Sequence, residues 1–320
     1  DLFLWNKKIK QSRMKSPREQ PLLKTIKNIL VTGASSEMGS ALIRKLLNNS
    51  GLKIRAIVHR SPVNIHGCEI RPGDLKKSDL LVKALFGIDT VVHIAALTKS
   101  TRESDYFEVN VRGTQNLIDA SLDCGVKKII YISSAAASLH GGGYSRSKLE
   151  AEQRIIKSGM QWVILRPSEV YGQRAGDSIN QLIHWVQNYF FVPVIGVGSC
   201  KLSPVFIDDV VPAMALAIFN EELENKTIVL AGPEELTYDD LVDRIATYFG
   251  VKRFKLYLPE GLIRLGIMIT SKLGINFVVP DQIPRLLCNK SFRIELAKKN
   301  LGYSPRILEE GIKNTITCNN

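Results

Sequence analysis

Apolar residues form two alternating patterns between residues 28 and 170. Short and nearly continuous apolar runs, such as residues 90–96, are typical of strands that are buried on both faces of a sheet. Between them, apolar residues recur at helical spacing. This alternation predicts an α/β fold with a Rossmann-type, doubly wound parallel sheet. We predict strands at 28–32, 53–58, 68–70, 90–95, 127–133 and 161–165, and helices at 38–47, 76–86, 104–124 and 144–157.

After about residue 170 the alternation of predicted strands and helices becomes irregular. We therefore predict a Rossmann domain at residues 28–170 and a smaller, mostly helical substrate-binding region at residues 171–320 that interleaves with the sheet. Open α/β sheets bind ligands at the carboxyl edge, so we expect the smaller region to pack there. Its predicted helices are 179–189, 208–219, 238–249, 259–273 and 293–299, and its predicted strands lie near 194 and at 227–230.

The composition is that of a folded chain. It has 320 residues, of which 45% are hydrophobic and 23% are charged, and this excludes a disordered protein. No run of about 20 uncharged apolar residues occurs, so we expect no transmembrane segment. The five cysteines are far apart and form no CxxC pair. This spacing argues against a disulfide scaffold or a metal site and predicts a reducing, cytoplasmic location.

Much of the net charge of +12 lies at the start of the chain. Residues 1–27 carry eight basic and two acidic side chains. The remainder is only mildly basic and has no basic motif, so we expect no nucleic-acid partner. We expect residues 1–27 to form a flexible leader, with organelle targeting and peripheral membrane association left open. The sequence begins at Asp1, and Met14 is an alternative start site.

A turn rich in small residues follows the first predicted strand. It reads Thr32-Gly33-Ala34-Ser35-Ser36-Glu37-Met38-Gly39 and leads into the first helix. Gly33 can make the tight turn, and Gly39 can let the helix pack close to the strand. The helix amino end then presents N–H groups and a positive dipole end to a pyrophosphate. The alternative is an ordinary capped turn between a strand and a helix.

The end of the second strand bears on which nucleotide would bind. An acidic residue there would accept the ribose 2′-hydroxyl of NAD, but the sequence reads Val58-His59-Arg60. Arg60 could face a 2′-phosphate instead. We therefore expect NADP to be preferred, with NAD as the alternative.

A tyrosine and a lysine occur four residues apart in the helix that follows the fifth strand. Tyr144 and Lys148 therefore lie on one helix face. A nearby ammonium favours the phenolate, so we expect Lys148 to lower the pKa of Tyr144. Such a tyrosine can exchange a proton with an alcohol or carbonyl oxygen while hydride moves. Ser133 and Ser134 end the preceding strand at the same sheet edge and could hydrogen-bond the same oxygen.

Together these features resemble the extended short-chain dehydrogenase/reductase superfamily, in its NAD-dependent epimerase/dehydratase branch. The resemblance runs from about residue 28 to residue 316, and it is specific for the superfamily but weak for the substrate. Its ordered motifs are residues 32–39, like TGxxGxxG; 73–75; 92–96; 110–116; Ser133-Ser134; Tyr144 with Lys148; 165–172, like LRPxxVYG; 206–209; 231–237; and 301–306.

The resemblance implies a role for each matched residue. Tyr144 would be the acid/base, Lys148 its electrostatic partner and a ligand of the nicotinamide ribose, and Ser134 the residue that orients the substrate oxygen. Asn110 would hold a water or backbone link to Lys148, and His93 is interpreted as a core residue. Homodimerisation through the helices that begin near residues 104 and 144 is also implied. The cofactor-binding residues would be Gly33, Ser35, Ser36, Glu37, Met38, Gly39, His59, Arg60, Asp74, Leu75, Ala95, Ala96, Tyr144, Lys148, Pro167 and Val170.

Several positions depart from the family pattern. Ser36 replaces the middle glycine of the turn, where a hydroxyl could weaken cofactor binding or hydrogen-bond the phosphate. Ala135 and Ala136 stand where dehydratases carry Asp-Glu, so we expect no dehydration. The segment 198–204 lacks the arginine that sugar-nucleotide enzymes often use on the diphosphate, and Glu169 replaces a frequent asparagine.

These observations leave three functions open. The first two are hydride-transfer enzymes for a small-molecule secondary alcohol or ketone: a sugar-nucleotide 4-epimerase and a carbonyl reductase or dehydrogenase, about equally favoured. The third is a non-catalytic NADPH-binding accessory subunit like that of respiratory complex I. A structural subunit has no chemical need for Ser134, Tyr144 and Lys148 together, which argues against the third.

Overall fold

The computed structural model describes residues 27–172, 178–263, 265–266, 280–288, 290 and 292–317. A seven-stranded sheet lies at its centre, and every neighbouring pair of strands in it is parallel. This arrangement confirms the predicted Rossmann-type fold. In order across the sheet, the strands are β11 (Lys226–Leu230), β6 (Gln161–Pro167), β5 (Lys128–Ile132), β4 (Thr90–His93), β1 (Asn28–Thr32), β2 (Lys53–Val58) and β3 (Cys68–Pro72).

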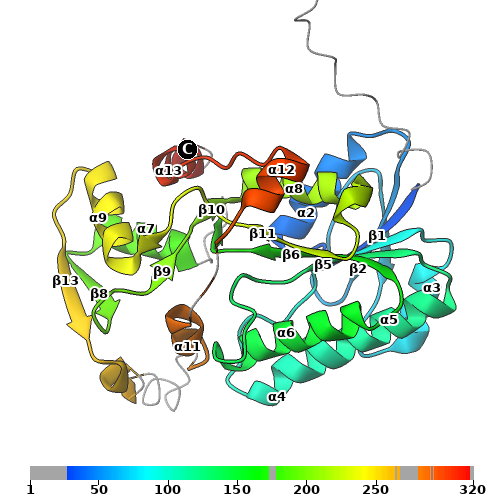
Figure 1. The fold of residues 1–320 in the computed structure, drawn as a ribbon, viewed down its shortest axis with the longest axis horizontal. Helices are drawn as coiled ribbons and strands as arrows, with labels where there is room; N and C mark the ends of the chain where they lie inside the picture. The colour runs from blue at the N-terminus through cyan, green and yellow to red at the C-terminus, as the bar shows by residue number, and fades with distance from the viewer. Residues whose placement is uncertain are drawn as a thin grey trace, which may run out of the picture.

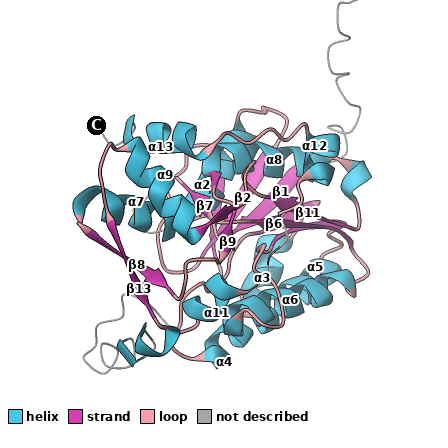
Figure 2. Ribbon diagram, turned by 60° about the vertical axis from the view of Figure 1, so that its left-hand side comes forward, coloured by secondary structure: helices cyan, strands magenta, loops and turns pink. Residues whose placement is uncertain are grey.

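Helices cover both faces of the sheet (Figures 1 and 2). One layer contains α2 (Glu37–Leu47), α8 (Ile207–Phe219) and α12 (Glu295–Leu301), and the other contains α3 (Ser78–Leu85), α5 (Gly113–Asp123) and α6 (Gly142–Ile156). Each layer closes its own hydrophobic core against the sheet. The central strands β1, β4 and β5 are buried on both faces, which is why they read as continuous apolar runs, whereas the edge strand β3 is mostly exposed.

The later part of the chain packs beside the carboxyl edge of the sheet and also contributes β11 to it. Its small paired strands are β7 (Val170–Tyr171) with β10 (Val205–Phe206), β9 (Lys201–Leu202) with β12 (Leu236–Thr237), and β8 (Phe191–Ile195) with β13 (Phe254–Leu258). The remaining elements are α7 (Ser178–Asn188), η3 (Glu221–Leu223), α9 (Tyr238–Tyr248), α11 (Gln282–Leu287) and α13 (Leu308–Thr317).

The predicted helix at 104–124 is interrupted. The structure has α4 (Glu103–Tyr106), then a π-helical segment, η2 (Phe107–Arg112), and then α5. A π turn inserts an extra residue and rotates the side chains that follow it, and such turns occur often at functional sites. The strand β13 and the helices α11 and α13 were not predicted, and most of the predicted helix at 259–273 lies outside the described residues.

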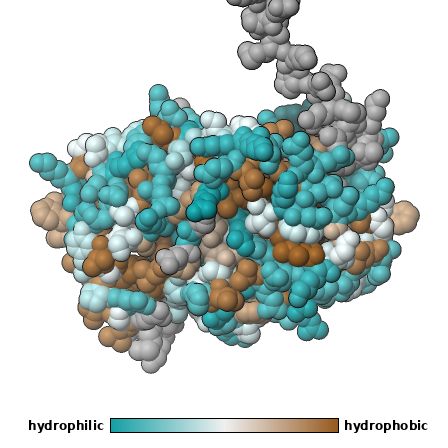
Figure 3. Space-filling view, in the orientation of Figure 1, coloured by the Kyte–Doolittle hydropathy of each residue, from teal (hydrophilic) through white to brown (hydrophobic). Residues whose placement is uncertain are grey.

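Apolar surface gathers at the left-hand end of the molecule in Figure 3, in the region of β8 and β13. Phe191 and Phe254 there are 58% and 59% exposed. Within the described part of the chain, no helix has the length and apolar character needed to cross a bilayer.

Candidate active site

A cavity of about 810 Å³ opens where the carboxyl ends of β1, β2, β4 and β5 meet. Parallel strands end at one edge of a sheet, so residues from distant parts of the sequence come together there. Most of the predicted cofactor-binding residues line this cavity: Gly33, Ser35, Ser36, Met38, His59, Arg60, Asp74, Leu75, Ala95, Ala96, Tyr144 and Lys148.

The turn after β1 is held by contacts that require glycine. Gly33 has a φ of +73°, and a Cβ at this position would lie 2.7 Å from the backbone nitrogen of Ala95. A Cβ on Gly39 would clash with the carbonyl oxygen of Gly33. Ser36 caps α2, since its hydroxyl donates to the Gly33 oxygen at 2.7 Å and accepts from the Gly39 N–H at 3.0 Å. The hydroxyl that replaces the family's middle glycine therefore stabilises the turn.

The ends of β2 and β3 form the far wall of the cavity. The imidazole of His59 lies 3.4 Å from the carboxylate of Asp74, which also accepts from the backbone N–H of Lys76. Arg60 is exposed at the cavity wall. His59 and Asp74 are thus paired, while Arg60 is open to solvent.

Tyr144 and Lys148 are both buried on the face of α6 that meets the sheet edge. The ammonium of Lys148 donates to the Ile132 carbonyl at 2.7 Å and lies 4.2 Å from the ring centre of Tyr131. Ser134 lies close to the phenol of Tyr144 and favours its phenolate form. The buried hydroxyl of Ser133, which lines the cavity, has no protein partner. Ser133, Tyr144 and Lys148 therefore line one cavity, and Ser134 lies beside the phenol.

Burial dominates the proton affinities at this point. It lowers the pKa of Lys148 to about 7, although the carboxylate of Glu152 acts in the opposite direction. Burial raises the pKa of Tyr144, while Arg285 and the hydrogen bond from Ser134 lower it and Asp281 raises it. The prediction that the pKa of Tyr144 is lowered is therefore wrong for the protein alone. Desolvation of the phenolate outweighs the charges around it.

Asn110 lies in the π-helical segment η2 and is 1% exposed. Its side chain accepts from the Leu97 N–H at 2.7 Å and donates to the Leu97 carbonyl at 3.1 Å and to the Ser147 hydroxyl at 2.9 Å. On α6 the amide contacts Ser147, the residue before Lys148, and the water or backbone link to Lys148 stays a prediction. Asn110 ties the loop after β4 to the helix that carries Tyr144.

Other predicted residues lie near the cavity but not in its wall. Glu37 begins α2 and lies close to Gly172, and Gly39 lies in the first turn of α2, where its N–H donates to Ser36. Pro167 ends β6, and Val170 begins β7. His93 is fully buried between the hydroxyls of Thr32 and Thr114, and its pKa is lowered to about 3 by burial and by Lys148, so it is a neutral core residue as interpreted from the sequence.

Three residues near the site were not identified from the sequence. Asp281 and Arg285 contact Tyr144, and Lys290 forms a 2.7 Å ion pair with Glu169. The side chain of Lys290 is only 2% exposed. The one signal in the sequence was Glu169, which departs from the family pattern and pairs with the nearly fully buried Lys290.

The sequence profile of the NAD dependent epimerase/dehydratase family matches residues 29–232. The match includes the glycine turn, Asn110, Ser134, Tyr144 and Lys148, in their structural order. The chain belongs to this family. The family's description includes dehydratases, so membership does not support the expectation that dehydration is excluded.

Relatives within the family have different activities. The chain is 29% identical over 284 residues to the 3beta-hydroxysteroid-dehydrogenase/decarboxylase isoform 1 of Arabidopsis thaliana, covering 76% of this chain and 65% of that protein. It is 26% identical over 316 residues to the UDP-glucose 4-epimerase of Vibrio cholerae, covering 90% and 94%. The structure of MoeE5 with UDP-glucuronic acid and NAD has a TM-score of 0.72 and 25% identity, covering 91% and 98%.

Substitution of Gly39 tests the packing of the turn. We predict that Gly39→Ala lowers the free energy of unfolding by about 1–3 kcal/mol, because the methyl group would overlap the Gly33 carbonyl. Gly51→Ala is the matched control, since its Cβ would meet only the Asn49 side chain at 3.4 Å. Urea unfolding measures both variants, and equal stabilities would contradict the prediction.

Substitution of Lys148 tests the burial of its amine. The pKa of Lys148 is about 7 in the folded chain and 10.5 ordinarily. Between these pH values the unfolded state binds the extra proton, so this residue makes the free energy of unfolding rise with pH. We predict that, between about pH 7 and pH 10, the free energy of unfolding of the wild type rises by roughly 1–4 kcal/mol more than that of Lys148→Met. Urea unfolding without added nucleotide measures this, and parallel pH profiles would refute it.

Proposed function

We propose that this protein is an NAD(P)-dependent enzyme that transfers hydride at a secondary alcohol or ketone of a small molecule. One observation carries the proposal: a buried tyrosine, with Ser134 close to its phenol, lies one helical turn before a buried lysine, and both line a cavity with a glycine turn at its edge. Tyr144 exchanges the proton with the substrate oxygen, and Ser134 orients that oxygen.

The cavity has the features that a dinucleotide needs. The absence of a side chain on Gly33 lets the turn pack against the backbone of Ala95, and the amino end of α2, whose first N–H groups attract anions, follows this turn. We propose that Gly33, Ser35 and Met38 hold the pyrophosphate, that Asp74 and Leu75 contact the adenine and that Lys148 holds the nicotinamide ribose. The bound nicotinamide would supply or accept the hydride. The relative MoeE5 was crystallised with NAD, while the exposed Arg60 favours NADP here.

The surroundings of Glu169 favour a dehydrogenase or reductase over a nucleotide-sugar enzyme. Glu169 and Lys290 neutralise each other, and Lys201 is paired with Glu235 at 2.6 Å. These two lysines are therefore already engaged by carboxylates, which disfavours a diphosphate ligand beside them. We propose an alcohol or ketone substrate without a diphosphate, as the hydroxysteroid relative suggests.

A UDP-sugar 4-epimerase is the second candidate. It is supported by the alignment with the Vibrio cholerae enzyme, which covers 94% of that protein. An epimerase reduces its own ketone intermediate and retains its cofactor, whereas a dehydrogenase exchanges its cofactor in every turnover. Cofactor release during turnover therefore separates the two candidates.

Replacement of Tyr144 tests the hydride-transfer proposal. We predict that Tyr144→Phe lowers kcat by about 10²- to 10⁴-fold, because the proton can no longer be exchanged. The assays use a 3β-hydroxysteroid with NAD⁺ or NADP⁺, and UDP-glucose for epimerisation. Tyr189→Phe, at a 52% exposed tyrosine, is the control. Nucleotide binding without turnover in either assay, by wild type as well, would favour the accessory-subunit alternative.

Replacement of Arg60 tests the cofactor preference. We predict that Arg60→Ala weakens NADPH binding about tenfold and leaves NADH binding nearly unchanged, because one charge-assisted contact to the 2′-phosphate is lost. Arg44→Ala, in the last turn of α2, is the control. Fluorescence titration with both nucleotides measures the effect, and equal losses for NADH and NADPH would refute the role of Arg60.

A further inference from the structure

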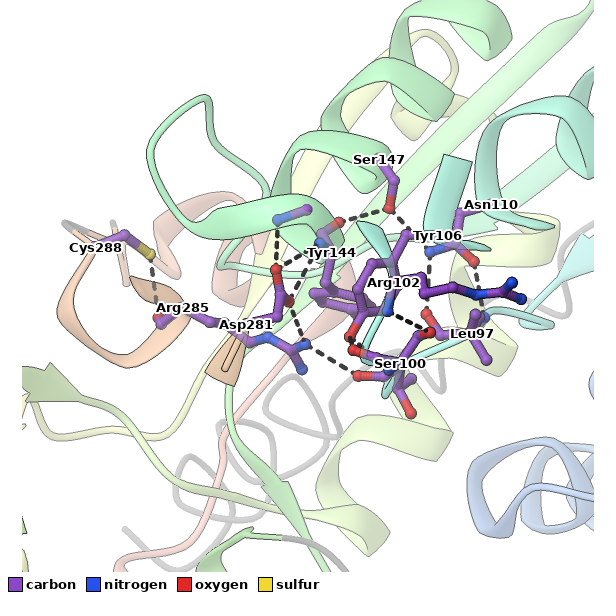
Figure 4. A network of polar contacts seen from close by, with 12 residues as sticks. Leu97, Ser100, Arg102, Tyr106, Asn110, Tyr144, Ser147, Asp281, Arg285 and Cys288 are labelled. Atoms are coloured by element: carbon purple, nitrogen blue, oxygen red, sulfur yellow. Dashed lines mark hydrogen bonds and ion pairs between the residues drawn. The ribbon is translucent and has the colours of Figure 1, made fainter. Parts of the chain in front are cut away.

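Helix α11, from the C-terminal part of the chain, lies against the start of α6 (Figure 4). Asp281, at the N-cap position of α11, points its carboxylate at the first turn of α6. The carboxylate accepts from the Gly143 N–H at 2.5 Å and from the Tyr144 N–H at 3.3 Å. The first N–H groups of a helix have no partner within the helix, and a negative charge there is stabilised by the helix dipole. Asp281 therefore caps α6 across 138 residues of sequence.

The glycine run at residues 141–143 makes room for this cap. Gly142 has a φ of +88°, and a Cβ on it would lie 2.5 Å from the Asp281 carboxylate. A Cβ on Gly143 would lie 3.3 Å from the same oxygen. The N-cap position of α6 is Gly141, which has no side chain that could cap the helix itself. The carboxylate supplied by α11 fills that role.

Arg285 connects the same helix to the phenol. Its guanidinium carbon lies 3.9 Å from the ring centre of Tyr144, within the range of a cation–π contact. The guanidinium also donates to Asp281 at 3.1 Å and to the Thr98 carbonyl at 3.0 Å. Arg285 thus contacts the tyrosine on α6, the loop after β4 and the start of its own helix. The dashed lines in Figure 4 mark its hydrogen bonds to that loop and to Asp281.

We propose that Asp281 and Arg285 are positioning residues for Tyr144, which makes α11 an integral part of the active site. Asp281 fixes the first turn of α6, and Arg285 fixes the ring and its electrostatic surroundings. This inference rests on the proposed acid/base function of Tyr144. Because the substrate-binding region supplies both side chains, it also controls the geometry of the proton-transferring group.

The two charges act on the phenol in opposite directions. The cation of Arg285 favours the phenolate, and the carboxylate of Asp281 disfavours it. Loss of Arg285 should therefore raise the pKa of Tyr144, and loss of the Asp281 charge should lower it. The other titratable groups facing this tyrosine are Tyr131 on β5 and Tyr106 on α4, and Lys148 lies one turn later on its own helix. All three remain in every variant. Arg285 lowers and Asp281 raises the pKa of Tyr106 as well, so the signal of Tyr106 shifts in the same directions.

The experiment measures ionisation of Tyr144 directly, without a substrate. Carbon NMR of protein labelled at the tyrosine ζ carbon follows the phenol, and its signal is assigned by its absence in Tyr144→Phe. We expect Arg285→Met to raise the midpoint by about one pH unit and Asp281→Asn to lower it. Arg285→Lys should restore the midpoint in part. Arg154→Met, which removes an exposed ion pair on the same helix, should leave it unchanged.

Amide hydrogen exchange supplies a second readout for the cap. Asp281→Ala should speed exchange of the Gly143 and Tyr144 amides about tenfold or more, while Asp281→Asn, which can still accept a hydrogen bond, should preserve most of the protection. Unshifted midpoints in Arg285→Met and Asp281→Asn, or unaltered exchange in Asp281→Ala, would overturn the inference. Neither readout requires turnover, so an active Tyr144→Phe enzyme would refute the proposed function while leaving this test intact.

Discussion

Parallel pairing of β1 with β2 and β4 is the constraint on which the site depends. The register aligns Thr32 with Ile57 on one side and with His93 on the other, so the three strands end together. The loops that follow them carry the glycine turn, His59 and the contact of Ala95 with Gly33. The hydrogen-bonded register of the sheet thus fixes how far apart these loops lie, and side-chain contacts then fix the positions of individual groups.

Burial then determines the chemistry that the gathered residues can perform. Lys148 sits in a site that disfavours its charge, and Tyr144 in one that disfavours the phenolate. Protein neighbours contact both groups: the Ile132 carbonyl contacts Lys148, and Ser134 and Arg285 lie beside the tyrosine. Small changes in these neighbours can therefore alter proton affinity by large amounts, because the interior screens charge poorly.

The parts of the fold that depend on local patterns could be predicted from the sequence. The strands and helices up to residue 170 and the cavity residues from Gly33 to Lys148 follow from strand–turn–helix order and from resemblance. The π segment at Phe107–Arg112 could not be predicted, because its apolar spacing also fits an ordinary helix. The roles of Asp281 and Arg285 were hidden because α11 has only six residues and its contacts cross 138 positions.

The distance along the chain between Asp281 and α6 has a consequence for how the protein is made. Synthesis proceeds from the amino end, and early segments can fold before later ones leave the ribosome. Every cavity-lining residue, from Thr32 to Lys148, precedes the α11 segment by more than a hundred positions. A nascent chain can therefore emerge with all of these residues while the amino end of α6 still lacks its cap. Under the proposed function, the order of translation would separate formation of the cavity from completion of its proton-transferring residue.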